Sequence, residues 1–181
     1  MLIWCRLGFL YAVYAAGPFF LWHRASVTAP IVKSFFTILR TENPDLKIGV
    51  AGFCWGGKYA LLLGQEQFSD IHLVDVVFAA HPSMVSVPKD IEAPYAPVSI
   101  AVAGNDKVFS VKMWERTQEI WEKNAEFSKF TVVVYEGAEH GFAVRGNMDN
   151  PKERERQEKA IDQVSISSQP ALVLQSTSAF K

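Results

Sequence analysis

The sequence of 181 residues lacks features that define several classes of protein. It has only two cysteines, Cys5 and Cys54, and no C-x-x-C or H-x-x-x-H spacing, which excludes a disulfide framework and a zinc knuckle. This cysteine usage favours a reducing compartment. Its 18 Lys+Arg and 19 Asp+Glu nearly cancel, so the chain has no basic excess of the kind that attracts nucleic acid, and no nucleic-acid partner is expected.

Acidic residues are missing from the first 41 positions, which contain four basic residues. The uncharged run Leu7–Trp22 is shorter than the ~20 residues that span a bilayer, and Gly17-Pro18 interrupts it, so no stable membrane insertion is expected. Residues 1–22 are open to four interpretations: domain core, secretory signal or anchor, mitochondrial presequence, or a misassigned start. We favour core and a cytoplasmic protein. A mitochondrial or secreted location follows if residues 1–22 act as a targeting segment.

Apolar runs alternate with helical patterns from residue 24 onward. At 49% hydrophobic and 20% charged, the composition is that of a globular chain. Continuous apolar runs of strand length predict buried strands, which lie at residues 47–53, 74–80, 98–103 and 131–135. Helical patterns separate these runs, so the sequence predicts an α/β fold with a mostly parallel sheet flanked by helices.

Two sequence signals mark helix starts. Thr28-Ala29-Pro30 predicts the start of a helix with one apolar face, formed by Ile31, Val32, Phe35, Phe36 and Leu39. Asn150-Pro151-Lys152-Glu153 has an Asn cap, an early Pro and a Glu at the third position, which predicts a charged, exposed helix to about Gln163. Serine-rich residues 164–181 are expected to form a loose tail, so residues 1–163 are expected to form one domain.

The segment Gly52-Phe53-Cys54-Trp55-Gly56-Gly57 lies between a predicted strand and a predicted helix. It has the G-x-nucleophile-x-G pattern of a strained turn, in which side chains two positions before and after the nucleophile would collide with their neighbours. Cys54 then lies at a helix N-terminus, which favours its thiolate, and the Trp55 N–H is placed to stabilise an oxyanion. A buried structural cysteine in a tight turn is the alternative.

Asp106 and His140 each follow a predicted strand end, where open α/β sheets place their sites. The chain order of nucleophile, acid and histidine is that of α/β-hydrolases. In such a trio His140 would take the Cys54 proton, and Asp106 would hold the imidazole in the required tautomer. The order and the positions at strand ends make coincidence a weak explanation.

These residues carry a resemblance to the dienelactone hydrolases, particularly their fungal members. It rests on Lys47–Ala60 (KIGVAGFCWGGKYA), Ala79–Ser83 (AAHPS), Gly104–Asp106 and Gly137–Gly146 (GAEHGFAVRG), and it extends from about Gly17 to Gln163. The resemblance implies an α/β-hydrolase fold and a Cys54–His140–Asp106 hydrolase that cleaves small ester or lactone substrates through an acyl-enzyme, without a metal or an organic cofactor.

The resemblance also suggests roles for residues around the histidine. Arg145 lies near the position of a family arginine that binds the substrate carboxylate, with one additional residue between histidine and arginine. A solvated surface arginine is the alternative. Phe142 is expected either to line the substrate pocket or to pack in the core. His81, between a strand end and a proline, is expected to be a hydrogen-bonded structural residue.

The resemblance implies that N-terminal strands of the family are missing from this chain. In the family, that region supplies a second oxyanion amide and a glutamate that contacts the cysteine, and no acidic residue precedes Glu42 here. The alternative to an active enzyme is therefore a truncated, catalytically impaired member that acts as a binding protein or has no function.

Overall fold

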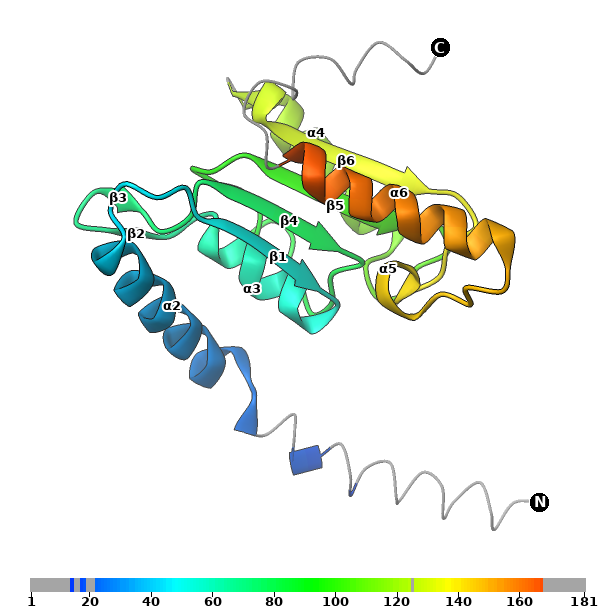
Figure 1. Cartoon of the computed structure of the whole chain (residues 1–181), viewed down its shortest axis with the longest axis horizontal. Helices are drawn as coiled ribbons and strands as arrows, with labels where there is room; N and C mark the ends of the chain where they lie inside the picture. Colours follow the sequence, from blue (N-terminus) through cyan, green and yellow to red (C-terminus); the bar gives the residue numbers. More distant parts are fainter. Residues whose placement is uncertain (1–13, 15–16, 19–21, 125, 168–181) are drawn as a thin grey trace.

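A computed structural model describes residues 14, 17–18, 22–124 and 126–167 (Figure 1). The predictions for a targeting segment, for Cys5 and for residues 168–181 fall wholly or largely outside this part of the chain. Its main element is a four-stranded parallel sheet in the order β1-β4-β5-β6. The strands are β1 (Gly49–Phe53), β4 (Val76–Ala80), β5 (Val98–Ala103) and β6 (Phe130–Tyr135). This bears out the predicted α/β architecture.

Helices cover both faces of the sheet (Figure 1). They are α2 (Ala25–Glu42), α3 (Trp55–Leu63), α4 (Val111–Glu122), α5 (Phe142–Arg145) and α6 (Pro151–Ser167). The strands separate two apolar clusters because successive side chains point to opposite faces. Val77 and Ala79 belong to the cluster that includes residues of α3 and α4, whereas Phe78 and Ala80 belong to the cluster with α5 and α6.

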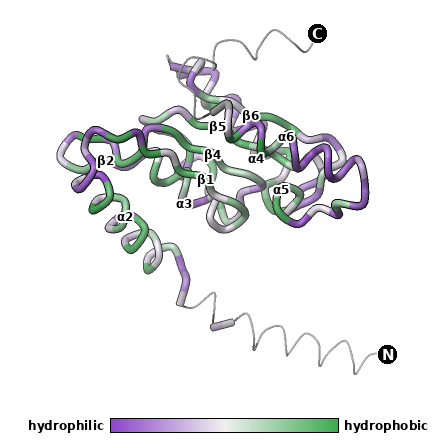
Figure 2. The backbone as a smooth tube through the Cα atoms, viewed as in Figure 1, coloured by the Kyte–Doolittle hydropathy of each residue, from purple (hydrophilic) through white to green (hydrophobic). Residues whose placement is uncertain are grey.

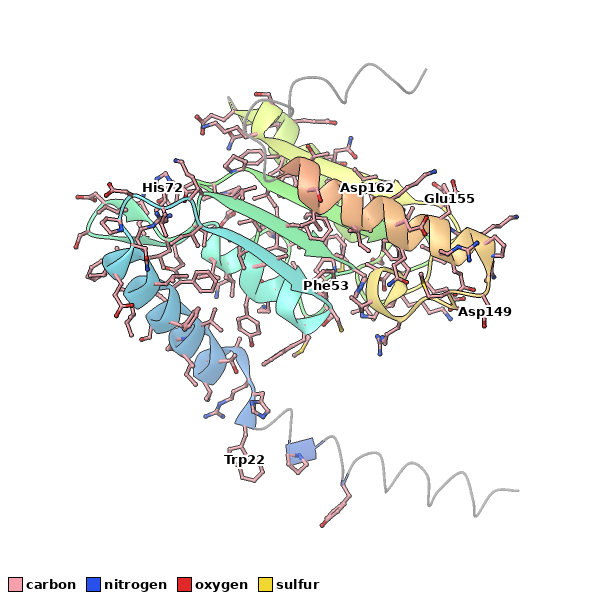
Figure 3. All side chains as sticks on the ribbon, viewed as in Figure 1. Trp22, Phe53, His72, Asp149, Glu155 and Asp162 are labelled. Atoms are coloured by element: carbon pink, nitrogen blue, oxygen red, sulfur yellow. The ribbon has the colours of Figure 1, made fainter. Side chains whose placement is uncertain are left out.

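Strand β1 forms one edge of the described sheet. Within the described residues it pairs only with β4, and its exposed positions include Phe53, which Figure 3 shows at the C-terminal end of the strand. The edge strands at both sides are therefore β1 and β6, with the two central strands β4 and β5 almost fully buried between them.

The predicted helix start at Thr28 is wrong, because α2 begins at Ala25 and contains Pro30. The Val27 and Thr28 N–H groups both donate to the Arg24 carbonyl, so an earlier turn precedes the proline. The predicted apolar face also divides. Val32, Phe36 and Leu39 pack against the core, whereas Ile31 and Phe35 are 65% and 61% exposed on a helix that is apolar along much of its length (Figure 2).

Strands β1 and β4 are each two residues shorter than predicted. Just before the two strands begin, the Asp75 N–H still donates to the Ile48 carbonyl at 2.7 Å, but the Ile48 N–H donates to the Asp75 side chain (Oδ2) at 2.7 Å. Arg40 donates to the same Oδ2 at 2.6 Å. A two-stranded antiparallel hairpin of β2 (Gln67–Phe68) and β3 (Ile71–His72) was not predicted, because its strands are too short for a period-two pattern.

Helix α6 begins at Pro151 as predicted, and its first turn carries the expected cap. The Asn150 side chain accepts from the Lys152 N–H at 3.1 Å and donates to Glu153 at 3.0 Å. The helix extends past the predicted end at Gln163 to Ser167. Gln163 bonds both Ser99 and Tyr135, at 2.8 Å each, and these contacts hold the last turns on the sheet.

No helix among the described residues is long and apolar enough to cross a membrane. Likewise, no group of three or more His, Cys, Asp or Glu side chains in this part of the chain is placed to hold a metal ion.

Candidate active site

Cys54 lies in the turn between β1 and α3 with φ 50° and ψ −118°, a backbone conformation that non-glycine residues rarely adopt. The turn is held on both sides, since the Cys54 N–H donates to the Ala80 carbonyl at 3.1 Å and the Ser83 N–H donates to the Cys54 carbonyl at 2.9 Å. Strain of this kind persists only where the surrounding structure enforces it, and it concentrates at functional sites.

The two glycines of the motif meet different surroundings. A Cβ at Gly52 would lie 2.3 Å from the Gly56 carbonyl oxygen, which bears out the expected collision two positions before Cys54. The expected collision at Gly56 is wrong, because a Cβ there would meet nothing within 4 Å. The close approach after Cys54 occurs one residue later, where a Cβ at Gly57 would lie 2.8 Å from the Pro82 Cβ.

The two glycines therefore predict opposite effects on stability. Gly52→Ala forces a Cβ into backbone atoms and is expected to lower the free energy of unfolding by about 3 kcal/mol, at the upper end for overpacking. Gly56→Ala, in the first turn of α3, is expected to be neutral or to stabilise by up to ~1 kcal/mol through helix propensity. Urea unfolding followed by circular dichroism measures both, and equal destabilisation by the two changes would contradict the geometry.

His140 links Cys54 to Asp106. Its Nε2 lies 3.1 Å from Cys54 Sγ, and its Nδ1 lies 2.8 Å from Asp106 Oδ2. The Asp106 side chain is fully buried, and its other oxygen accepts from the Val108 N–H at 2.7 Å and the Phe109 N–H at 3.3 Å. The fold thus brings together the three side chains predicted from strand ends that are far apart in the chain.

Hydrogen bonds at this cluster favour a charged sulfur–imidazole pair. Burial alone would raise the pKa of the Cys54 thiol, but its hydrogen bonds with His140, Ser83 and the Trp55 N–H outweigh burial and lower it. Burial likewise would lower the pKa of His140, but hydrogen bonds to Cys54 and Asp106 raise it above its ordinary value. The two shifts have opposite signs, and each of them favours a thiolate beside an imidazolium.

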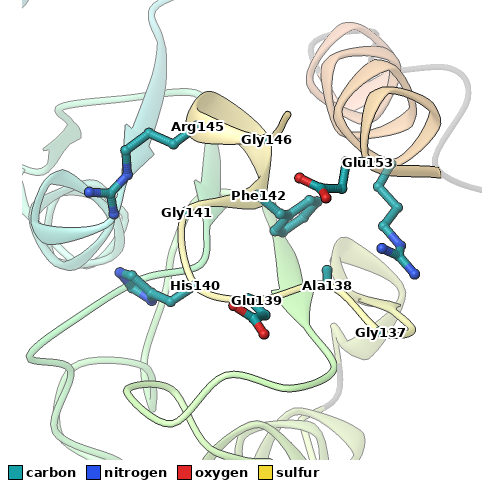
Figure 4. A pocket seen from close by; sticks show the side chains of 10 residues that line it. Gly137, Ala138, Glu139, His140, Gly141, Phe142, Arg145, Gly146 and Glu153 are labelled. Atoms are coloured by element: carbon teal, nitrogen blue, oxygen red, sulfur yellow. The ribbon is translucent and has the colours of Figure 1, made fainter. Parts of the chain in front are cut away.

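A cavity of about 300 Å³ adjoins His140 and is bordered by the segment 137–146 and the start of α6 (Figure 4). Arg145 and Phe142 both line it. Figure 4 shows His140 and Arg145 on one side of the segment, with Phe142 and Glu153 on the other.

Arg145 is exposed, and its guanidinium folds over Gly141, where a Cβ would lie 2.9 Å from Nε and Nη2. Its guanidinium makes no hydrogen bond or ion pair within the part of the chain that the structure describes. Phe142 is 7% exposed and contacts the rings of His81 and Tyr135, so it packs in the core and borders the cavity at once.

The expectation of a hydrogen-bonded His81 is wrong. Its ring is fully buried, neither ring nitrogen has a hydrogen-bond partner among the described residues, and it packs edge-on against His140 with centroids 5.1 Å apart. Its neighbours Phe53 and Phe142 offer only aromatic surface. Burial, followed by the proximity of His140, lowers the pKa of His81 to about 4, so this imidazole is neutral near pH 7.

Sequence reasoning missed Ser83, whose Oγ lies 3.6 Å from Cys54 Sγ. In the sequence, the segment AAHPS points to its histidine and not to its serine, because a serine three residues past a strand end has no distinctive spacing.

A sequence model of the dienelactone hydrolase family matches residues 23–166. The chain belongs to this family. Its relatives include "Hydrolase tropI" of Talaromyces stipitatus, 30% identical over 70% of this chain and 47% of the relative. "Dienlactone hydrolase 1" of Gibberella moniliformis is 32% identical over 62% of this chain and 40% of the relative. This dienelactone hydrolase family member thus spans about half the length of the curated relatives it matches.

Solved structures share the fold. Esterase 2 of Thermogutta terrifontis, in a form phosphoramylated by tabun, superposes with a TM-score of 0.59 at 20% identity, covering 76% of this chain and 63% of that chain. The native form of the same esterase gives a TM-score of 0.58. The described sheet and helices are therefore an α/β-hydrolase fold, as the resemblance implied.

Proposed function

We propose that this family member hydrolyses small ester or lactone bonds through a Cys54–His140–Asp106 triad. The observation that carries the proposal is the continuous hydrogen-bonded chain from Cys54 Sγ through both His140 nitrogens to buried Asp106. Its chemistry matches an activated nucleophile whose base is oriented by a third group.

The reaction has two stages. The Cys54 proton passes to His140 Nε2, and the thiolate attacks the carbonyl carbon of the ester. The Trp55 N–H, which bonds the sulfur at rest, stabilises the oxyanion of the tetrahedral intermediate. The intermediate collapses to a thioester, and the departing alkoxide takes the proton from His140. Water then attacks the thioester, His140 takes its proton, and the acid is released with the thiolate.

Trapping the acyl-enzyme tests the proposal. A p-nitrophenyl ester is expected to produce a burst of p-nitrophenol, with the acyl mass on the peptide containing Cys54 in acid-quenched samples. Turnover without an acyl adduct on Cys54 would contradict the mechanism. A reactive Cys54 with no ester or lactone turnover would favour the alternative of an impaired, non-enzymatic family member.

Arg145 is proposed to bind an anionic group of the substrate, because its exposed guanidinium is unpaired among the described residues and borders the same cavity as His140. Phe142 is proposed to shape the apolar side of this cavity from its buried position. The proposed substrate is thus a small ester or lactone with a carboxylate.

Arg145→Gln is expected to raise KM about tenfold for a carboxylate-bearing ester, because one exposed charge-assisted hydrogen bond is lost. The KM for a neutral ester of the same size is expected to stay unchanged. Arg116→Gln is the matched control, since Arg116 is an exposed arginine paired with Glu119 on α4. Equal losses for both esters would assign Arg145 to structure instead of recognition.

A further inference from the structure

The turn after β4 places a hydroxyl group against the sulfur of Cys54. Ser83 Oγ lies 3.6 Å from Sγ, and Ser83 is only 8% exposed. Positive φ angles at His81 (36°) and Met84 (58°) bend the chain on either side of it, and Pro82 packs against Gly57 of α3. Backbone bonds between Ala80, Cys54 and Ser83 fix the separation of the two side chains.

The hydroxyl has no other hydrogen-bond partner in the described part of the chain, so its bonding capacity is directed at the sulfur. A buried hydroxyl needs a partner, and Cys54 supplies it. A serine hydroxyl has its own proton to donate, so its O–H can donate to Sγ both while the S–H is directed at His140 and after His140 has taken that proton. It therefore keeps a hydrogen bond on both sides of the proton transfer to His140.

We propose that Ser83 is a further catalytic residue, whose O–H donates to the Cys54 thiolate once His140 has taken the thiol proton, and again when this thiolate leaves during hydrolysis of the thioester. The inference rests on the proposed function, in which Cys54 is the nucleophile. With His140 Nε2 and the Trp55 N–H, Ser83 completes a set of three groups around the sulfur.

Besides Arg145, whose guanidinium folds over Gly141, other charged or titratable groups lie near the sulfur. His140 faces it directly, with Asp106 behind, and His81 packs edge-on against His140. Lys58 on α3 is directed away into a buried ion pair with Asp90 at 2.6 Å. The pH dependence of the thiol therefore reports chiefly on His140 and on the neutral donors.

The test measures the rate of Cys54 alkylation by iodoacetamide against pH, which requires no ester turnover. Ser83→Ala is expected to move the lower apparent pKa of the profile upward by about one unit, and to slow alkylation about tenfold below it. Rates of variant and wild type are expected to converge at high pH, where the thiol is ionised in both. The Ser83 backbone N–H is unaffected by this change.

Two controls separate the hydroxyl from packing. The side chains introduced by Ser83→Thr and Ser83→Val have the same shape and differ in one hydroxyl group. The apparent pKa of the alkylation profile is therefore expected to move upward in the valine variant and to stay near that of wild type in the threonine variant. This pair carries the test even if the alanine variant does not fold. Ser99→Ala removes another buried serine hydroxyl, one that bonds Gln163 on α6, and is expected to leave the profile unchanged.

The proposed role of Ser83 would be overturned if Ser83→Thr and Ser83→Val gave the same pH profile of alkylation, or if Ser99→Ala shifted the profile as much as Ser83→Ala does. If the wild type hydrolyses esters but Ser83→Ala does not shift the pH profile of alkylation, the proposed role of Ser83 is wrong and the proposed hydrolase function stands. If Ser83→Ala shifts the profile but the wild type hydrolyses no ester, Ser83 activates the thiol as proposed and the proposed hydrolase function is wrong.

Discussion

Cys54→Ala is expected to reduce ester turnover by at least about 10³-fold, because the variant has no atom that can form the thioester. The residual rate then comes from binding and from the Trp55 N–H alone. Initial rates with a p-nitrophenyl ester, corrected for hydrolysis in buffer, measure the loss.

Cys54→Ser provides the comparison. A serine hydroxyl is far less acidic than the thiol, and the charged pair with His140 no longer forms, so we expect turnover between that of the alanine variant and wild type. Stability needs to be compared in parallel, since the residue occupies a strained turn. An alanine variant that folds and retains a tenth of the wild-type turnover would rule out Cys54 as the nucleophile.

Asp106→Asn is expected to lower turnover by about 10³- to 10⁴-fold through the tautomer of His140. The amide oxygen is held by the Val108 and Phe109 N–H groups, so the amide NH₂ faces His140 Nδ1. Nδ1 must then accept, which places the ring proton on Nε2. Nε2 can no longer take the proton of the Cys54 thiol.

Asp106→Asn is also expected to change the pH dependence of Cys54 alkylation, which can be measured without ester turnover. Without a base, the Cys54 thiol returns toward its ordinary pKa, so alkylation slows at neutral pH and recovers in alkaline solution. Asp149→Asn, in the exposed loop before α6 (Figure 3), is the matched change of charge and is expected to leave both readouts unchanged. An Asp106→Asn profile equal to that of wild type would show that Asp106 does not govern the base.

Much of the candidate site could be predicted from the sequence because parallel strands end at the same edge of a sheet. Cys54, Asp106 and His140 each follow a strand whose apolar run is visible in the sequence, so the topology brings them together. Val98–Ala103 was predicted to the residue because both faces of β5 are buried, and its run is therefore continuous.

What escaped prediction depends on contacts that leave no periodic signal. The position that has no room for a Cβ is Gly57 and not Gly56, because Pro82 lies against Gly57. Pro82 belongs to a different connection between strands of the sheet. The turn that brings Ser83 to Cys54 has positive φ at His81 and Met84, a conformation that is uncommon for non-glycine residues. The unpaired ring of His81 depends on its aromatic neighbours.

The distance along the chain between Cys54 and His140 has a consequence during synthesis. His140 follows Cys54 by 86 residues. At a translation rate of about 5–20 residues per second, the cysteine leaves the ribosome roughly 4–17 s before its base does. Over that interval the nascent thiol lacks its hydrogen bond to His140, so we expect it to keep its ordinary acidity, to stay mostly protonated and to react slowly with oxidants and electrophiles. In the proposed triad, Cys54 therefore gains its base only after β6 and the segment 137–146 have folded against the turn that holds it.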